Sequence, residues 1–169
     1  VPLLSESLTR RWIIDPARGA AVATPAGLMG ILNATPDSFS DGGTHLTVER
    51  ALATAATMRA AGVAWLDVGG ESTRPGALPI SEAEEIRRVV PILTALQPLG
   101  VPLSIDTTKA AVARAALAAG ATMINDVTAL RGDVRMAAVA ARTRATVILM
   151  HMRGTPRTMQ RAPRYREVV

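Results

Sequence analysis

The sequence predicts an α/β protein in which helices cover a sheet of parallel strands. Five short apolar runs, at 28–32, 64–68, 102–106, 122–126 and 146–150, alternate with Ala-rich segments of helical character. The runs are continuously apolar, which is typical of parallel strands buried on both faces. The chain has 169 residues, 49% of them hydrophobic, and this is enough for one core of ordinary domain size.

The composition excludes several classes of protein. There are no cysteines, so disulfides, thiolate metal sites and cysteine nucleophiles are ruled out. No apolar run approaches the ~20 residues of a membrane span and no signal peptide opens the chain, so we expect a cytoplasmic protein without a membrane partner. The net charge is +5 and 18 of the 19 basic residues are Arg. They are scattered and only 2% of the chain is aromatic, so no nucleic-acid partner is expected.

Capping signals define the helices that follow the first two apolar runs. A helix is predicted over 47–61, because Thr47 can cap its start and Gly62 can end it in a left-handed conformation. The next helix is predicted over 81–99, where Ser81 and Glu84 have the spacing of a capping box. Pro91 should kink this helix or tilt its second half.

The remaining helices and an N-terminal hairpin complete the expected fold. Helices are predicted over 109–119, ended by Gly120, and near 133–142. Residues 12–14 and 20–24 read as the strands of a small antiparallel hairpin, which we expect to cover the bottom of the sheet structure or its edge.

Each of the five apolar runs ends in a polar or ionisable residue. Parallel sheets place their ligand sites at the carboxyl ends of the strands. The residues at these ends are Asn33, Asp67, Asp106, the pair Asn125 and Asp126, and His151. Their recurrence in all five runs favours one common site over five unrelated turns or helix caps. The sequence has no Gly-x-Ser-x-Gly elbow, Walker A loop or Gly-x-Gly-x-x-Gly turn after a strand, so those three kinds of site are not expected.

Two long motifs resemble a known family. Residues 29–43, MGILNATPDSFSDGG, and residues 67–76, DVGGESTRPG, resemble the first and second signatures of the dihydropteroate synthases. The shorter segments 104–107, 124–127 and 149–154 resemble further family segments in the same order. The resemblance covers about residues 28–160. It departs from the family pattern at Ala34, and at Thr128 and Ala129, where Ser-Gly is usual.

The resemblance implies a fold and a reaction. The fold is a (β/α)8 TIM barrel, of which residues 28–169 would form about the first five βα units of a pterin-binding domain and residues 1–27 a hairpin extension. The reaction, a step of folate biosynthesis and a target of sulfonamides, joins a dihydropterin methyl diphosphate to 4-aminobenzoate and releases pyrophosphate. The resemblance further implies Mg²⁺ as cofactor and a homodimer for the full-length protein.

The same resemblance assigns roles at the strand ends. Asn33 is expected to ligate Mg²⁺ through its amide oxygen, and Thr73 and Arg74 are expected to bind the diphosphate, on which charge gathers as it leaves. Asp106 and Asn125 are expected to form a polar floor for the pterin ring, with Asp67 helping to hold it.

Further roles follow for residues in the loops. Asp106 and Asp41 are expected to be catalytic, since a carboxylate near the pterin would stabilise a cationic ring. Phe39 and Pro75 are expected to close over the aminobenzoate, and Met150 is expected to pack against the pterin face. His151 is expected to make a structural hydrogen bond.

The length of the chain leaves part of the family pattern unmatched. A (β/α)8 barrel needs roughly 250 residues, and the resemblance places an Asp, a Lys and a Ser-x-Arg diphosphate grip on strands six to eight. We therefore expect a C-terminally incomplete sequence, and no synthase activity from these 169 residues alone. Two alternatives stay open: a methyltetrahydrofolate methyltransferase with a related pterin barrel, and a pterin-binding homologue without catalysis. The loop motifs favour the synthase.

Overall fold

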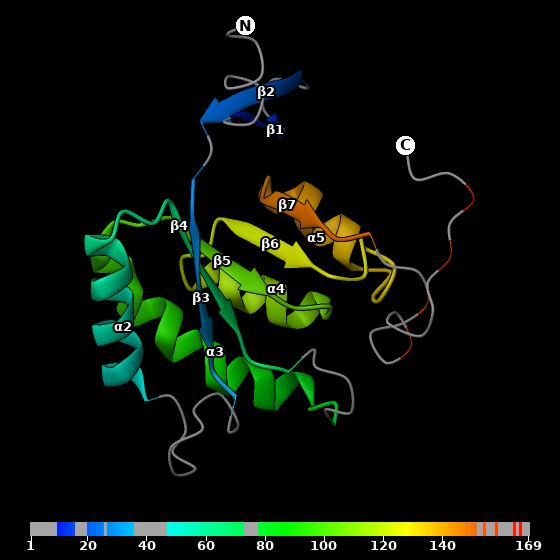
Figure 1. The fold of residues 1–169 in the computed structure, drawn as a ribbon. Helices are drawn as coiled ribbons and strands as arrows, with labels where there is room; N and C mark the ends of the chain where they lie inside the picture. The colour runs from blue at the N-terminus through cyan, green and yellow to red at the C-terminus, as the bar shows by residue number, and fades with distance from the viewer. Residues whose placement is uncertain are drawn as a thin grey trace, which may run out of the picture.

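The protein contains a two-stranded hairpin and a five-stranded parallel sheet (Figure 1). A computed structural model describes residues 10–15, 20–25, 27–35, 47–72 and 78–151, with positions 154, 158, 164 and 166. The sheet strands are β3 (Met29–Asn33), β4 (Trp65–Gly69), β5 (Leu103–Asp106), β6 (Met123–Asp126) and β7 (Thr146–Leu149). All five predicted strands are therefore confirmed to within one residue at each end.

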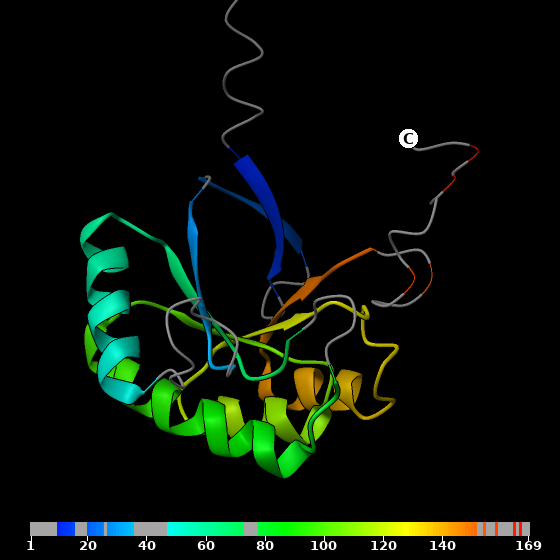
Figure 2. The ribbon, with the colours of Figure 1, turned by 60° about the horizontal axis from the view of Figure 1, so that its bottom comes forward.

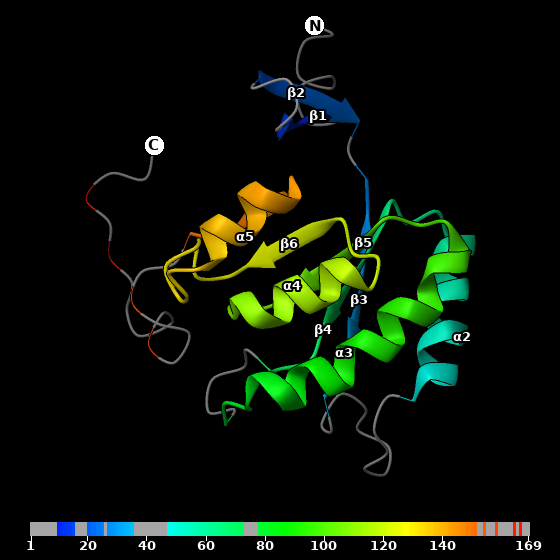
Figure 3. The ribbon, with the colours of Figure 1, turned by 180° about the vertical axis from the view of Figure 1, so that it is seen from behind.

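The sheet is wound in chain order, with every neighbouring pair parallel. Four helices connect the strands: α2 (Val48–Ala60), α3 (Glu82–Leu96), α4 (Ala110–Ala118) and α5 (Met136–Thr143). All four lie on one face of the sheet, as Figures 2 and 3 show from two directions. A doubly wound sheet would carry helices on both faces, whereas helices on a single face are the arrangement of a (β/α) barrel. The predicted fold class is confirmed: the described residues form five consecutive strands of such a barrel and the four helices between them.

The core lies between the sheet and the helices. Side chains on successive strand residues point to opposite faces, so alternate residues face the helices. Six of those facing the helices are apolar and almost fully buried: Leu32, Leu66, Val68, Leu103, Ile105 and Ile124. The helices contribute many buried alanines, among them Ala51, Ala55, Ala113 and Ala116, whose small side chains let the helix backbones approach the sheet closely. The opposite face of the sheet, the inner face, carries the polar residues of the site.

The helix starts agree with the capping prediction at two positions. Thr47 Oγ1 accepts a hydrogen bond from Arg50 N at 3.3 Å, and Ser81 Oγ accepts one from Glu84 N at 3.1 Å. The reciprocal half of the expected capping box does not form, because the Glu84 carboxylate pairs with Arg87 and Arg88 instead. Gly62 and Gly120 adopt positive φ angles of 84° and 101°, as expected of residues that end helices.

Two helices differ from their predicted bounds. The helix expected over 81–99 is α3 followed by a 3-10 turn, η1 (Gln97–Leu99), and α3 runs through Pro91. Helix α5 begins at Met136 because Asp133 accepts hydrogen bonds from Arg135 N and, through its backbone oxygen, from Met136 N. Asp133 also accepts from Ala110 N at 3.0 Å, so it caps α4 from another loop.

The hairpin pairs β1 (Arg10–Asp15) with β2 (Ala20–Pro25) in antiparallel register. It lies beyond the end of the sheet at which β3 begins, at the opposite end from the polar strand ends (Figure 1). The expectation that the hairpin covers the bottom of the structure stays a prediction. The boundary between a hairpin extension and a barrel domain stays a prediction.

Candidate functional site

The strand register aligns four polar or small residues at the carboxyl ends of β3 to β6. Asn33 lies opposite Gly69, Gly69 lies opposite Asp106, and Asp106 lies opposite Asn125. These four residues form the upper row of the inner face. The row beneath contains Asp67, which lies opposite Ser104 on β5. Asn33, Asp67, Asp106 and Asn125, predicted separately from four apolar runs, are thus brought together on one face.

Asp67 and Asn125 are joined directly. Asn125 Nδ2 donates a hydrogen bond to Asp67 Oδ2 at 2.9 Å. Asp67 is 3% exposed, and its other oxygen, Oδ1, has no hydrogen-bond partner among the described residues. The neighbouring hydroxyl of Ser104 is fully buried and equally without a partner in the described part of the chain. Leaving buried polar groups unpaired is costly, so the lower row is suited to a ligand that supplies hydrogen bonds.

Asp106 is electrostatically perturbed. Burial, and after it the negative charges of Asp67, Glu85 and Asp126, together raise the pKa of its carboxyl from 3.8 to about 7. The group therefore changes its charge near neutral pH. A ligand that presents N–H donors to Asp106 would favour the ionised form, because hydrogen bonds to a carboxylate stabilise its charge.

Gly69 keeps the centre of the upper row open. A Cβ atom at this position would lie 3.6 Å from Asn33 Oδ1 and 3.7 Å from Asp106 Oδ2. The amide oxygen and the carboxylate therefore flank a backbone position without a side chain. Close approach of a ligand to the backbone is a common use of glycine at such positions.

Asp126 belongs to the opposite face of the sheet. It follows Asn125 directly, so the alternation of a strand turns it toward the helices. Its Oδ1 accepts from Thr128 N and its Oδ2 accepts from Leu130 N, at 2.8 and 2.9 Å. The expectation that all the polar strand ends share one cavity is therefore wrong for Asp126, which holds a loop in which Ala129 and Leu130 have positive φ angles.

The last two predicted residues lie at the end of β7. Met150 is half-buried, two positions beyond Ile148, the residue opposite Asn125. Its backbone N–H donates to Asp126 O at 3.4 Å. His151 is exposed. The proposed packing of Met150 on a pterin and the structural role of His151 stay predictions.

Five predicted site residues lie outside the described part of the chain. They are Phe39 and Asp41 after β3 and Thr73, Arg74 and Pro75 after β4. Their expected roles rest on the motifs alone.

Sequence reasoning missed Ser104, Gly69 and a polar cluster around Lys109. Alternation along 103–106 would have placed Ser104 on the same face as Asp106. The sequence also offers a signal for Lys109, which is the single lysine among 19 basic residues.

The upper row supplies oxygen ligands that fit a magnesium ion whose other ligands are substrate and water. Mg²⁺ in phosphate-transfer sites takes one or two protein oxygens and keeps several waters. Asn33 Oδ1 is such an oxygen, on an exposed residue beside Asp106. Within the described ranges, no group of three or more His, Asp or Glu side chains could hold a metal by itself.

The chain belongs to the family described as pterin binding enzymes, which matches residues 29–169. Within this family it is similar to dihydropteroate synthases. The enzyme of Synechocystis is 50% identical over 143 residues, 84% of this chain and 50% of the relative. The Escherichia coli K12 enzyme is 50% identical over 142 residues, 83% of this chain and 50% of the relative. The chain therefore spans about half the length of these relatives.

Solved structures of dihydropteroate synthases share the fold. The Yersinia pestis enzyme, solved as a sulfonamide drug complex, superposes with a TM-score of 0.79 at 49% identity, covering 89% of this chain and 55% of that one. The Burkholderia cenocepacia enzyme, complexed with 7,8-dihydropteroate, gives 0.65 at 46% identity, over 88% of this chain and 49% of that one. The Xanthomonas albilineans enzyme with 4-aminobenzoic acid gives 0.74 at 46% identity, over 94% and 55%.

Proposed function

We propose that the protein carrying this chain is a dihydropteroate synthase. It would form a bond between the amino nitrogen of 4-aminobenzoate and the methylene carbon of a dihydropterin methyl diphosphate, with release of pyrophosphate. The observation that carries the proposal is the inner face of β4 to β6, where Asp67, Asp106 and Asn125 present two carboxylates and an amide side by side. Relatives at about 50% identity that bear this name support it.

The inner face suits the hydrogen-bonding edge of a pterin. That edge offers N–H donors together with ring acceptors, so it needs carboxylate acceptors and a group that both donates and accepts. Asp106 would accept N–H bonds from the ring, while Asn125 would accept and donate through its amide. The unpaired Oδ1 of Asp67 and the hydroxyl of Ser104 offer additional hydrogen bonds deeper in the site. As the diphosphate leaves, the ionised Asp106 would stabilise positive charge on the ring.

The diphosphate end of the substrate would lie toward the loops. Asn33 would hold Mg²⁺, which neutralises charge on the leaving diphosphate when bound. Thr73 and Arg74 would donate hydrogen bonds to the phosphate oxygens, and Arg is suited to this because its planar fork binds two oxygens at once. Phe39, Pro75 and Asp41 would close over the aminobenzoate and the reacting carbon, and Met150 would lie against the pterin face.

The remaining expectations concern partners and location. We propose small-molecule substrates, a homodimer for the full-length protein, no nucleic-acid or membrane partner, and a cytoplasmic location. Among the residues that the structure describes, none of the helices has the length and apolar character to cross a membrane.

Turnover by the protein that carries this chain tests the proposal. Labelled 4-aminobenzoate should appear in dihydropteroate when the pterin diphosphate and Mg²⁺ are both present, and neither should be dispensable. Asp106→Asn keeps the shape of the side chain but removes its charge, and it should reduce turnover roughly a hundredfold. Glu82→Gln, at a half-exposed position on α3, is the control and should leave turnover unchanged. A folded protein that binds pterin without forming product would instead favour the non-catalytic homologue.

A further inference from the structure

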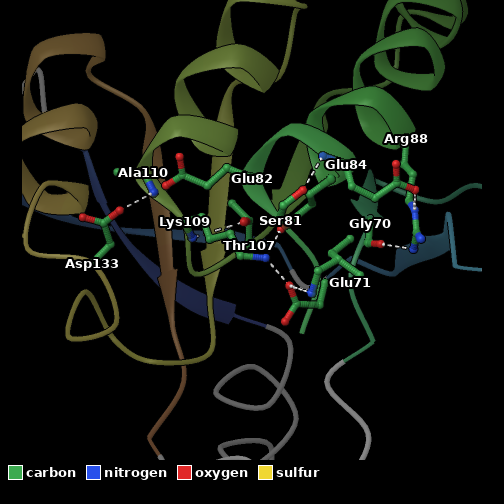
Figure 4. Close-up of polar contacts among 12 residues, drawn as sticks. Gly70, Glu71, Ser81, Glu82, Glu84, Arg88, Thr107, Lys109, Ala110 and Asp133 are labelled. Atoms are coloured by element: carbon green, nitrogen blue, oxygen red, sulfur yellow. Dashed lines mark hydrogen bonds and ion pairs between the residues drawn. The ribbon is translucent and has the colours of Figure 1, made fainter. Parts of the chain in front are cut away.

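The connection from β4 to α3 is held at its base by a polar cluster (Figure 4). The chain leaves β4 at Gly70 and Glu71 and returns at Ile80, just before the α3 cap Ser81. Lys109, the residue that precedes α4, lies at the centre of this cluster. We call Lys109, Glu71, Glu85 and the Ile80 amide the loop clamp.

One carboxylate of the loop clamp joins both ends of the connection. Lys109 Nζ forms an ion pair with Glu71 Oε2, and the same oxygen accepts a hydrogen bond from Ile80 N at 3.5 Å. Glu71 and Ile80 are nine positions apart in the chain. The hydrogen bond from Ile80 to Glu71 therefore joins the two ends of the connection, and the ion pair with Lys109 holds the joined ends against the residue that precedes α4.

The second carboxylate anchors the clamp to α3. Lys109 Nζ lies 2.6 Å from Glu85 Oε2, and Glu85 is only 1% exposed. Its other oxygen, Oε1, has no hydrogen-bond partner among the described residues. Burial alone would lower the pKa of Lys109, but its hydrogen bonds to Glu71 and Glu85 raise it, so the ammonium stays charged. A buried carboxylate needs such a compensating charge.

The residue type at position 109 fits a clamp better than a solvated surface charge. Every other basic residue in the sequence is Arg, yet this position holds the single Lys. An ammonium is compact and can donate in three directions, whereas a guanidinium is a wide planar fork. A position between two carboxylates from different elements therefore suits an ammonium better than a guanidinium.

The first residue of the connection is fixed from the other side. Arg88 Nη1 donates to Gly70 O at 3.1 Å while its Nε donates to Glu84. A Cβ atom on Gly70 would lie 2.8 Å from Val89 Cγ1 and 2.9 Å from Glu85 Cγ, so the backbone packs directly on α3. The base of the connection is therefore packed and hydrogen-bonded against α3.

We propose that Lys109 is a positioning residue for diphosphate binding. Lys109 would act through Glu71, which lies two positions before Thr73 in the loop after β4. Lys109 also follows Asp106 by three positions. It would therefore couple this loop to the strand end that forms the pterin floor. The identity of the ligand rests on the proposed function; the mechanical role of the clamp does not.

The test uses the protein that carries this chain and three variants. Lys109→Met removes the charge and keeps the stem. Lys109→Met with Glu85→Gln also removes the unpaired buried charge, and so restores stability without restoring the clamp. Arg87→Met is the control, because it breaks an exposed ion pair on the same helix. The readouts are amide hydrogen exchange at Ile80, affinity for inorganic pyrophosphate with Mg²⁺, and affinity for a dihydropterin that lacks the diphosphate.

The proposal predicts a selective loss. Both Lys109 variants should exchange the Ile80 amide faster and bind pyrophosphate roughly tenfold more weakly, while Lys109→Met leaves the affinity for the dihydropterin unchanged. The control should match the wild type in all three readouts. Unchanged Ile80 exchange in the double variant, or equal losses for both ligands, would overturn the proposal. If the wild type binds no pyrophosphate, the proposed function fails, and the exchange measurement alone decides whether the clamp exists.

Discussion

Asp106 lies at the carboxyl end of β5, near several negatively charged side chains. Its carboxyl is opposed across the sheet by Asn125 and faces the charge of Asp67 on the neighbouring strand. Burial and these charges bring its pKa to about 7. Since Asn125 already donates to Asp67, the inner face is richer in acceptors than in donors. A ligand with N–H groups relieves this imbalance.

The first prediction at the scale of the residue concerns the titration of Asp106. Replacing Asp67 by Asn removes a negative charge that raises the pKa of Asp106, so that pKa should fall below its wild-type value. Carbon-detected NMR of the Asp106 carboxyl against pH measures the change. Glu82→Gln removes a charge that does not perturb Asp106 and should leave the midpoint where it is. An unshifted midpoint in Asp67→Asn would contradict a contribution of the Asp67 charge to the pKa of Asp106.

The same titration affects stability with a defined sign. Folded Asp106 keeps its proton up to about pH 7, whereas the unfolded chain releases it near 3.8. The folded state thus binds more protons between these values, and its free energy of unfolding falls as pH rises through this window. Asp106→Asn should abolish this component, so the variant should gain stability relative to the wild type between pH 4 and pH 7. Urea unfolding at a series of pH values measures it, and parallel profiles would contradict the assignment.

At the scale of the element, two adjacent glycines at the end of β4 serve different purposes. A Cβ on Gly70 would meet α3 at 2.8 Å, but one on Gly69 would meet only ordinary contacts at 3.6 Å. Gly70→Ala should therefore lower the free energy of unfolding by about 1–3 kcal/mol. Gly69→Ala should leave stability nearly unchanged and weaken pterin binding. Urea unfolding and ligand titration of both variants separate the roles, and equal behaviour of the two would refute them.

Another element-scale prediction concerns the loop after β6. Ala129 has a φ angle of 53°, a conformation that costs residues with a Cβ roughly 1 kcal/mol. Ala129→Gly relieves this strain but adds freedom to the unfolded chain, so the free energy of unfolding should stay nearly unchanged. Ala53→Gly, in the exposed interior of α2, should lower it by about 1 kcal/mol, since there glycine only adds freedom to the unfolded chain. A loss of stability in both variants would show that Ala129 is not strained.

Local signals were sufficient to predict most elements. Apolar runs located the strands, and the side chains of Thr47 and Ser81 located two helix starts, because capping depends on residues close in sequence. The start of α5 and the cap of α4 depend on Asp133, which contacts Ala110 from another loop. Such contacts across the fold leave no local pattern, which is why the bounds of these helices were less well predicted.

The site was predictable in its residues more than in its connections. The position of Asp67, Asp106 and Asn125 at strand ends followed from the chemistry of parallel sheets. Asp126 was misplaced because the shared-cavity argument ignored the opposite orientation of adjacent residues in a strand. The pairing of Lys109 with Glu71 and Glu85 joins positions 38 and 24 residues apart, so no spacing along the sequence could indicate it.

At the scale of the whole molecule, the helices on one face leave the inner face of five parallel strands for chemistry. The edge strands of the sheet are β3 and β7, and Ile31 on β3 is 60% exposed although it is apolar. The relatives are about twice as long as this chain, so activity is a property to be measured on the whole protein that carries it.

The measurement that tests the central claim most directly is the affinity for a dihydropterin as a function of pH, with wild type and Asp106→Asn in parallel. If the ionised Asp106 binds the ring, wild-type affinity should rise about tenfold per pH unit below the pKa near 7 and level off above it. The variant should bind more weakly above pH 7 and show no such rise. Equal affinities and equal profiles for the two proteins would contradict a pterin site at the carboxyl ends of these strands.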